Sequence, residues 1–204
     1  TPSFFFFFFS VTPASGFPKT ITLDFGSGCT NPNTGVTRCG KMIFILSDSL
    51  RITGSTAVLS FDNYFVNGFK REGTITWTNV STPGHRSWTR QVVAGKITAP
   101  NGNWWLHNAL KTISQVQGMG TIIAADDAFE TTGSGTVVNS NNVTRSYTIL
   151  EALLTKNICH HIVAGRLKVE GPQHYAIINY GNGACDNIAT ISIDGGNPFP
   201  IQLP

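Results

Sequence analysis

The fold class is decided by residues 57–80, "AVLSFDNYFVNGFKREGTITWTNV". Two runs rich in β-branched and aromatic residues flank the dipeptide Asn67-Gly68 in this stretch. Asn and Gly both accept the positive φ angles that a two-residue type I′ turn requires. The stretch therefore predicts a β-hairpin.

The same pattern of strand and turn continues on both sides of the hairpin. In "FPKTITLDFGSG", Ile21, Leu23 and Phe25 alternate with polar residues, as in a half-buried strand. "GKMIFILSDS" is a second, more apolar strand, and "CHHIVAGRLKVEG", "HYAIINYGNG" and "NIATISIDGG" are strands of the C-terminal third. Further turns are expected at Asn101-Gly102 and at Gly133-Ser134-Gly135. Many short strands joined by such turns predict an all-β protein, an antiparallel β-sandwich or flattened barrel.

One segment departs from this pattern. Leu106, Ala109, Leu110, Ile113 and Val116 recur at helical spacing, so a short helix is expected near residues 106–117. For "LEALLTKN", at residues 150–157, a turn or two of helix and a continuation of the preceding strand are both open.

Length and composition set the domain organisation and exclude some partners. With 204 residues, one domain is the default, and we expect an apolar N-terminal arm at residues 1–16 and a single domain at residues 17–204. The net charge is +3, but the basic residues are scattered, which argues against a nucleic-acid partner. No stretch reaches about 18 apolar residues, so no transmembrane segment is expected. Any export signal is expected to have been removed already.

Four cysteines indicate an oxidising compartment. An even number of cysteines in a chain poor in charged residues favours disulfides. The expected pairs are Cys29 with Cys39, which closes a short loop, and Cys159 with Cys185, which joins two late strands; crossed pairs and free thiols are the alternatives. No C-x-x-C spacing points to zinc.

Metal and catalytic sites have weak signals in this sequence. His160 and His161 are neighbours, and on a strand neighbouring side chains point to opposite faces, so they are not expected to share a metal ion. Glu72 with Glu130 or Glu151 could form a carboxylate pair for glycoside cleavage, but eleven acidic residues supply such pairs by chance. No G-x-S-x-G elbow is present. We expect no cofactor, no metal and no enzyme.

The tryptophans are candidates for sugar contacts. Trp77, Trp88, Trp104 and Trp105 could line an aromatic platform on a β-sheet, or could fill its core. Because Trp104 and Trp105 are adjacent, a strand would expose one of them.

Several motifs together resemble a known family. "FPKTITLDFGSGC", "FDNYFVNG" with the following "EGT" and "TN", and "YGNGACDNIATISIDG" resemble a family of uncharacterised bacterial secreted proteins and surface lipoproteins, from about Phe17 to the C-terminus. The resemblance implies an exported, all-β protein, extracellular or at the cell surface of a bacterium. It carries no catalytic residues over to this chain.

Six phenylalanines precede the part of the chain that shows the resemblance: Phe4, Phe5, Phe6, Phe7, Phe8 and Phe9. They are a strand of the protein's own fold, a segment that adds to the sheet of another molecule, or residues that were not securely identified. Our hypothesis is a non-catalytic surface protein, a subunit of an extracellular or envelope assembly such as a fibre. The arm would add as a strand to a like subunit or to another envelope protein. The alternative is a glycan-binding module that uses exposed tryptophans.

Overall fold

Strands account for nearly all the regular structure of the chain. The computed structural model describes residues 7–204 and contains no α-helix in that range. The strands are β1 (Phe8–Thr12), β2 (Lys19–Asp24), β3 (Cys29–Thr30), β4 (Thr37–Leu46), β5 (Thr56–Val66), β6 (Phe69–Asn79), β7 (Ser87–Thr98), β8 (Trp104–Gln117), β9 (Ala128–Asn139), β10 (Thr144–Lys156), β11 (Ala164–Glu170), β12 (Tyr175–Asn182), β13 (Ile188–Ile193) and β14 (Phe199–Gln202). A single 3₁₀ turn, η1 (Ala124–Asp126), precedes β9. The predicted all-β antiparallel class, a sandwich or flattened barrel, is confirmed.

The order of the strands in the sheet is their order along the chain. The hydrogen-bonded order is β1-β2-β4-β5-β6-β7-β8-β9-β10-β11-β12-β13-β14, and β3 lies off this path and pairs with β4. The described chain forms two compact units. The first holds residues 7–79, 91–108 and 138–142, and the second holds residues 80–90, 109–137 and 143–204.

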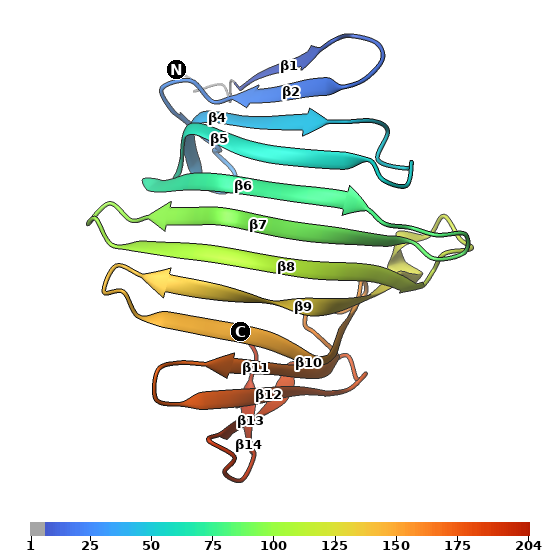
Figure 1. Cartoon of the computed structure of the whole chain (residues 1–204), viewed down its shortest axis with the longest axis vertical. Coiled ribbons are helices and arrows are strands. Elements are labelled where there is room, and N and C mark those ends of the chain that lie inside the picture. The colour runs from blue at the N-terminus through green and yellow to red at the C-terminus, as the bar shows by residue number, and fades with distance from the viewer. Residues whose placement is uncertain (1–6) are drawn as a thin grey trace. The chain divides into compact units, whose positions relative to one another are not determined.

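In the first unit, β1, β2, β4, β5 and β6 lie side by side (Figure 1). The predicted hairpin is confirmed: β5 pairs with β6 through Val66 and Phe69, and the turn residues Asn67 and Gly68 have φ angles of 48° and 80°. The core of this unit comprises Phe25, Ala57, Leu59, Tyr64 and Val92. The Phe25 ring lies 5.7 Å from Tyr64, so aromatic packing joins the end of β2 to β5.

The second unit contains the meander from β10 to β14 and its own core. Its buried apolar residues are Ala109, Ala128, Leu153, Val163 and Ala189. Residues 150–156 continue β10, which settles the alternative left open for "LEALLTKN" in favour of a strand. The expected strands of the C-terminal third are β11, β12 and β13.

The helix expected near residues 106–117 is wrong, because these residues belong to strand β8. The apolar residues of the helical pattern are divided between the two faces: Ala109 is buried, whereas Leu110 and Val116 are exposed. Two polar residues alternate with other side chains on the same face as Ala109, and both have partners. The ammonium of Lys111 lies 5.1 Å from the Tyr147 ring, and Gln115 donates to Asp127 Oδ1 at 2.7 Å.

The turn expected at Gly133-Ser134-Gly135 is also wrong, since β9 runs through it. Gly133 has a φ of +127°, and a Cβ there would lie 2.1 Å from the backbone oxygen of Leu110. Similar close approaches to a backbone oxygen occur at Gly40, Gly73 and Gly165. Gly40, Gly73 and Gly133 mark irregular positions inside long strands, and Gly165 marks one at the start of β11.

Candidate functional site

The N-terminal strand is the first candidate for an interaction surface. β1 is the first strand of the sheet order and pairs with β2, with Phe8 opposite Asp24 and Phe9 opposite Leu23. The backbone groups on the outer side of β1 therefore have no neighbouring strand among residues 7–204. An edge strand of this kind can pair with a strand from another molecule.

The phenylalanines of this segment differ in their surroundings. The ring of Phe7 lies 5.9 Å from buried Phe25, so it reaches the core of the first unit. Phe8 and Phe9 are 73% and 60% exposed. Phe4, Phe5 and Phe6 lie outside the described residues. Phe8 and Phe9 thus belong to a strand of the protein's own fold, which was the first alternative. Their rings and the strand edge are exposed, as the second alternative, addition to the sheet of another molecule, requires.

Polar contacts hold the β1–β2 connection in place. The ammonium of Lys19 donates to the backbone oxygens of Pro13 and Ala14, at 3.2 and 2.9 Å. On β2, Asp24 accepts from the backbone N–H of Gly26 at 2.9 Å and forms an ion pair with Lys41 at 3.2 Å. These contacts, led by the Gly26 hydrogen bond, hold the pKa of Asp24 below its usual value of 3.8. The strand that supports β1 therefore carries an ionised carboxylate at neutral pH.

The tryptophans lie on three strands: Trp77 on β6, Trp88 on β7, and Trp104 and Trp105 on β8. Trp105 is 40% exposed, as expected for one member of the adjacent pair. Trp104 is half-buried, and the Lys96 ammonium lies 5.3 Å from its ring. Trp77 and Trp88 are also half-buried. Trp105 is therefore the most exposed of the four in relative terms.

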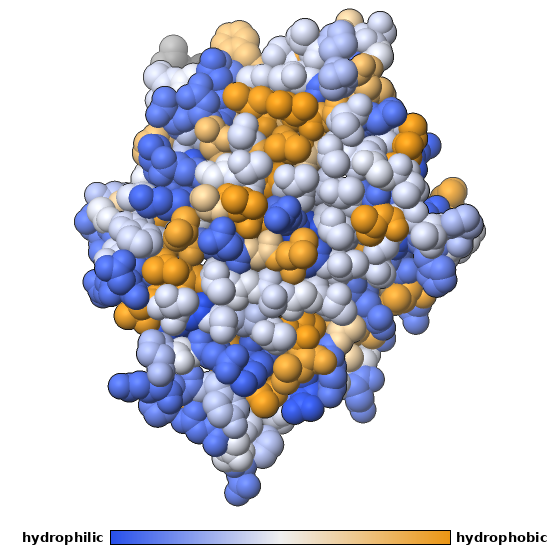
Figure 2. Space-filling model, viewed as in Figure 1, coloured by the Kyte–Doolittle hydropathy of each residue, from blue (hydrophilic) through white to orange (hydrophobic). Residues whose placement is uncertain are grey.

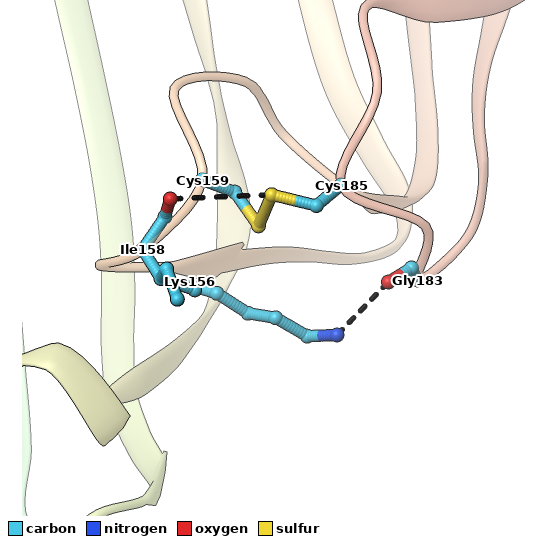
Figure 3. Close-up of a disulfide and its surroundings, with 5 residues drawn as sticks. All are labelled: Lys156, Ile158, Cys159, Gly183 and Cys185. Atoms are coloured by element: carbon cyan, nitrogen blue, oxygen red, sulfur yellow. Dashed lines mark hydrogen bonds between the residues drawn. A yellow bond between two sulfur atoms is a disulfide. The ribbon is translucent and has the colours of Figure 1, made fainter.

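One of the two expected disulfides is present. Cys159 and Cys185 are bonded, with Cα atoms 5.5 Å apart (Figure 3). The bond joins the β10–β11 connection to the β12–β13 connection. Lys156 adds a second link between these segments, because its ammonium donates to the backbone oxygen of Gly183 at 2.9 Å (Figure 3).

The expected Cys29–Cys39 disulfide is wrong, since both residues are free thiols. Cys29 lies in register with Arg38, not with Cys39. Side chains alternate along a strand, so Cys39 points to the face opposite the one that Cys29 shares with Arg38. Closing a short loop in sequence therefore does not bring these two sulfurs together.

The candidates for a metal site and for a catalytic carboxylate pair include His160, His161, Glu72 and Glu151. His160 and His161 lie in the β10–β11 connection and not on a strand. Glu72 is paired with Lys70 at 2.9 Å, and Glu151 with Arg166 at 3.0 Å. No group of three or more His, Cys, Asp and Glu side chains within residues 7–204 could hold a metal ion.

Sequence reasoning missed one polar pair. His174 and Asp194 are 20 residues apart, yet the imidazole Nδ1 contacts the carboxylate of Asp194. Asp194 also accepts from the backbone N–H of Tyr175 at 2.9 Å. The Tyr175 amide first, and His174 second, lower the pKa of Asp194 from its usual 3.8. Gly195 and Gly196 indicate a turn directly after Asp194, but nothing in the sequence places His174 beside Asp194.

Apolar side chains also reach the surface away from β1. On the face shown in Figure 2, they form separate patches between polar side chains. The part of the chain that the structure describes has no helix long and apolar enough to span a membrane. No protein-family model, curated protein or solved structure matches the chain.

Proposed function

We propose that this chain is a non-catalytic, exported cell-surface protein that works by association through its N-terminal strand. The carrying observation is the combination of an open strand edge with two exposed phenylalanines, Phe8 and Phe9, on β1. Removing a phenylalanine side chain from water contributes roughly 1.5–3 kcal/mol. A partner that covers both rings and pairs with the backbone of β1 gains from both contributions.

The partner is a like subunit or another envelope protein. β1 already has a strand on its inner side, so the added strand would come from the partner and extend the sheet outward. The Cys159–Cys185 disulfide supports export, because disulfides persist in oxidising compartments. The resemblance to secreted and surface proteins points in the same direction.

The test compares the wild-type chain with the double variant Phe8→Lys/Phe9→Lys by light scattering over a range of concentrations. We expect the wild type to assemble and the variant to remain monomeric, since Lys on an edge strand discourages pairing. Phe199→Lys is the matched control, because Phe199 is also an exposed phenylalanine on an end strand, β14. Equal assembly of the wild type and the double variant, or loss of assembly in the control alone, contradicts the proposal.

A glycan-binding module is the second candidate function, favoured by the exposed ring of Trp105. Its neighbour Trp104 is half-buried and has the Lys96 ammonium 5.3 Å from its ring, so Trp105 is the better placed of the two for a sugar. Titration with a panel of neutral polysaccharides tests this candidate. Binding lost in Trp105→Ala and kept in Leu110→Ala, an exposed apolar residue on the same strand, supports it. Absence of binding to the whole panel removes it.

A further inference from the structure

A groove of about 560 Å³ lies on the second unit, beside the turn that joins β11 to β12. This volume is within the range of about 300–1,000 Å³ typical of small-ligand sites. Its apolar lining includes Val169, Ala176 and Ile193. The register places these three side by side, because Val169 is opposite Ala176 and Ala176 is opposite Ile193. Three strands thus form a continuous apolar strip.

A fixed histidine stands beside this strip. His174 lines the groove, and Asp194 engages its Nδ1 while also accepting from the Tyr175 amide. The carboxylate is therefore anchored to the backbone, and its contact with Nδ1 orients the exposed imidazole. The other ring nitrogen, Nε2, is left to meet a ligand.

Arg145 supplies a charge that the groove does not neutralise. It lines the groove, and within residues 7–204 no hydrogen bond or ion pair engages its guanidinium group. The nearby acidic groups are already engaged: Asp194 contacts His174, and Glu170 pairs with Lys168 at 2.7 Å. An unpaired guanidinium beside an apolar strip favours an anionic group on a partly apolar ligand.

The groove also presents planar polar groups in a row. Gln173 and His174 lie in the β11–β12 connection, and Arg145 lines the same groove from β10. Amide, imidazole and guanidinium groups bind hydroxyl and carboxylate oxygens, and a guanidinium binds a carboxylate with two parallel hydrogen bonds. The C–H face of a sugar ring can pack on an apolar strip such as the one here.

A peptide bound by strand addition does not suit this place. β10, β11, β12 and β13 each have a hydrogen-bonded neighbour on both sides. The groove therefore lies on the face of paired strands, where no free backbone edge is offered. Recognition here depends on side chains.

We propose that this groove binds an acidic sugar unit, with its carboxylate on Arg145, its hydroxyl groups on Gln173 and His174, and its ring on the apolar strip. The site is separate from β1 and does not depend on the association proposed above. It gives the chain a specific chemical class of ligand, a polysaccharide that contains uronic acid or a similar carboxylated sugar.

The test measures binding of tri-galacturonate, neutral maltotriose and tri-glutamate to the full chain by calorimetry. We expect tri-galacturonate to bind and the other two to bind at least about tenfold more weakly. Arg145→Gln should weaken tri-galacturonate binding about tenfold or more, since a hydrogen bond to a charged group is lost. Arg71→Gln, in the first unit, removes the same charge as a matched control and should leave binding unchanged.

Each remaining outcome overturns the proposal. No binding of tri-galacturonate, or binding unchanged in Arg145→Gln, shows that the groove does not take an acidic sugar. Equal or tighter binding of tri-glutamate shows a site for acidic peptides. The Phe8→Lys/Phe9→Lys variant should keep its affinity for tri-galacturonate, so the result is independent of assembly through β1.

Discussion

The two end strands of the sheet, β1 and β14, differ in how they meet solvent. β1 exposes two phenylalanines and has no proline within its bounds. β14 contains Pro200 and directly follows Pro198. Proline has no backbone N–H to give to a further strand, and it is a common protection of exposed edges.

The neighbourhoods of the two ends differ as well. The connections that flank β11 and β12, near the C-terminal end of the order, are joined by the Cys159–Cys185 disulfide. In the first unit, both cysteines near the N-terminal end are free thiols. A disulfide thus secures the connections near β14, and prolines protect β14 itself, whereas β1 has neither. This difference is what makes β1, and not β14, the expected site of association.

The largest expected effect is a loss of folding stability when a closely packed glycine is replaced, and each unit has such a glycine. Gly40 in the first unit and Gly165 in the second have φ angles of +77° and +102°, and an added Cβ would lie 2.0 and 2.2 Å from a backbone oxygen. We expect Gly40→Ala and Gly165→Ala each to cost about 4 kcal/mol, from the strained φ angle and the lost strand pairing. Urea unfolding measures this.

Gly102→Ala is the matched control for these variants. Gly102 has a φ of +86°, but no atom lies within 4 Å of an added Cβ. It should cost only about 1 kcal/mol, for the φ angle alone. Costs as small for Gly40→Ala and Gly165→Ala as for the control would show that the strands accommodate the methyl group by shifting.

Removal of the disulfide should give the next largest loss of stability, and this loss should be confined to the second unit. The two bonded cysteines are 26 residues apart. A loop of that length corresponds to about 3.5 kcal/mol of stabilisation in the chain-entropy account. Cys159→Ser/Cys185→Ser should therefore lower the stability of the second unit by this amount, measured by hydrogen exchange with mass spectrometry in each unit.

Cys29→Ser/Cys39→Ser is the control for the disulfide variant. These thiols form no bond with each other, so the cost should stay below about 1 kcal/mol. A loss of protection in the control as large as that in Cys159→Ser/Cys185→Ser would mean that Cys29 and Cys39 also form a covalent link.

Replacing the prolines at the edge strand β14 should have a smaller effect, on self-association. Pro198→Thr/Pro200→Thr gives β14 the backbone donors that it lacks. Introduced into the Phe8→Lys/Phe9→Lys background, these changes should restore weak, concentration-dependent self-association, measured by light scattering. If the combined variant stays monomeric at every concentration, the prolines are not what protects β14.

Acid sensitivity is the smallest expected difference. Asp24 and Asp194 both have a folded-state pKa below the usual value of 3.8. Each therefore contributes stability that is present above the unfolded-state pKa and is lost as the pH falls through the folded-state pKa. Asp24→Asn should make the first unit lose less stability than the wild type between about pH 5 and pH 2, and Asp194→Asn should do the same for the second unit.

Hydrogen exchange with mass spectrometry at both pH values assigns these effects to a unit. Asp194 is exposed and Asp24 is partly exposed, so the differences will be small. Identical acid profiles of wild type and variants in both units would mean that these hydrogen bonds do not lower the two pKa values.

The sequence predicted strands well where turn chemistry was local. Asn67-Gly68 specified its hairpin because both residues must adopt positive φ angles. The turn predicted at Gly133 was wrong because glycine also occurs inside a strand, at places where a neighbouring backbone comes too close for a side chain. The two uses of glycine look alike until the partner strand is known.

Other features depended on partners that are distant in sequence. Lys111 and Gln115 on β8 are polar residues whose partners, Tyr147 and Asp127, lie on later parts of the chain. The Cys29–Cys39 pairing failed on register, which spacing alone does not give. Of the proposed acidic-sugar site, no part was predicted, because Arg145, His174 and Asp194 come from separate strands and turns.

The agreement between strand order and chain order has a consequence for how this protein folds and changes. Almost every strand pairs only with its neighbours in sequence, so contacts can form hairpin by hairpin without long loops being closed first. The same arrangement lets a hairpin be gained or lost at either end of the order without rerouting the rest of the chain. A fold of this kind can lengthen over evolution by adding pairs of strands.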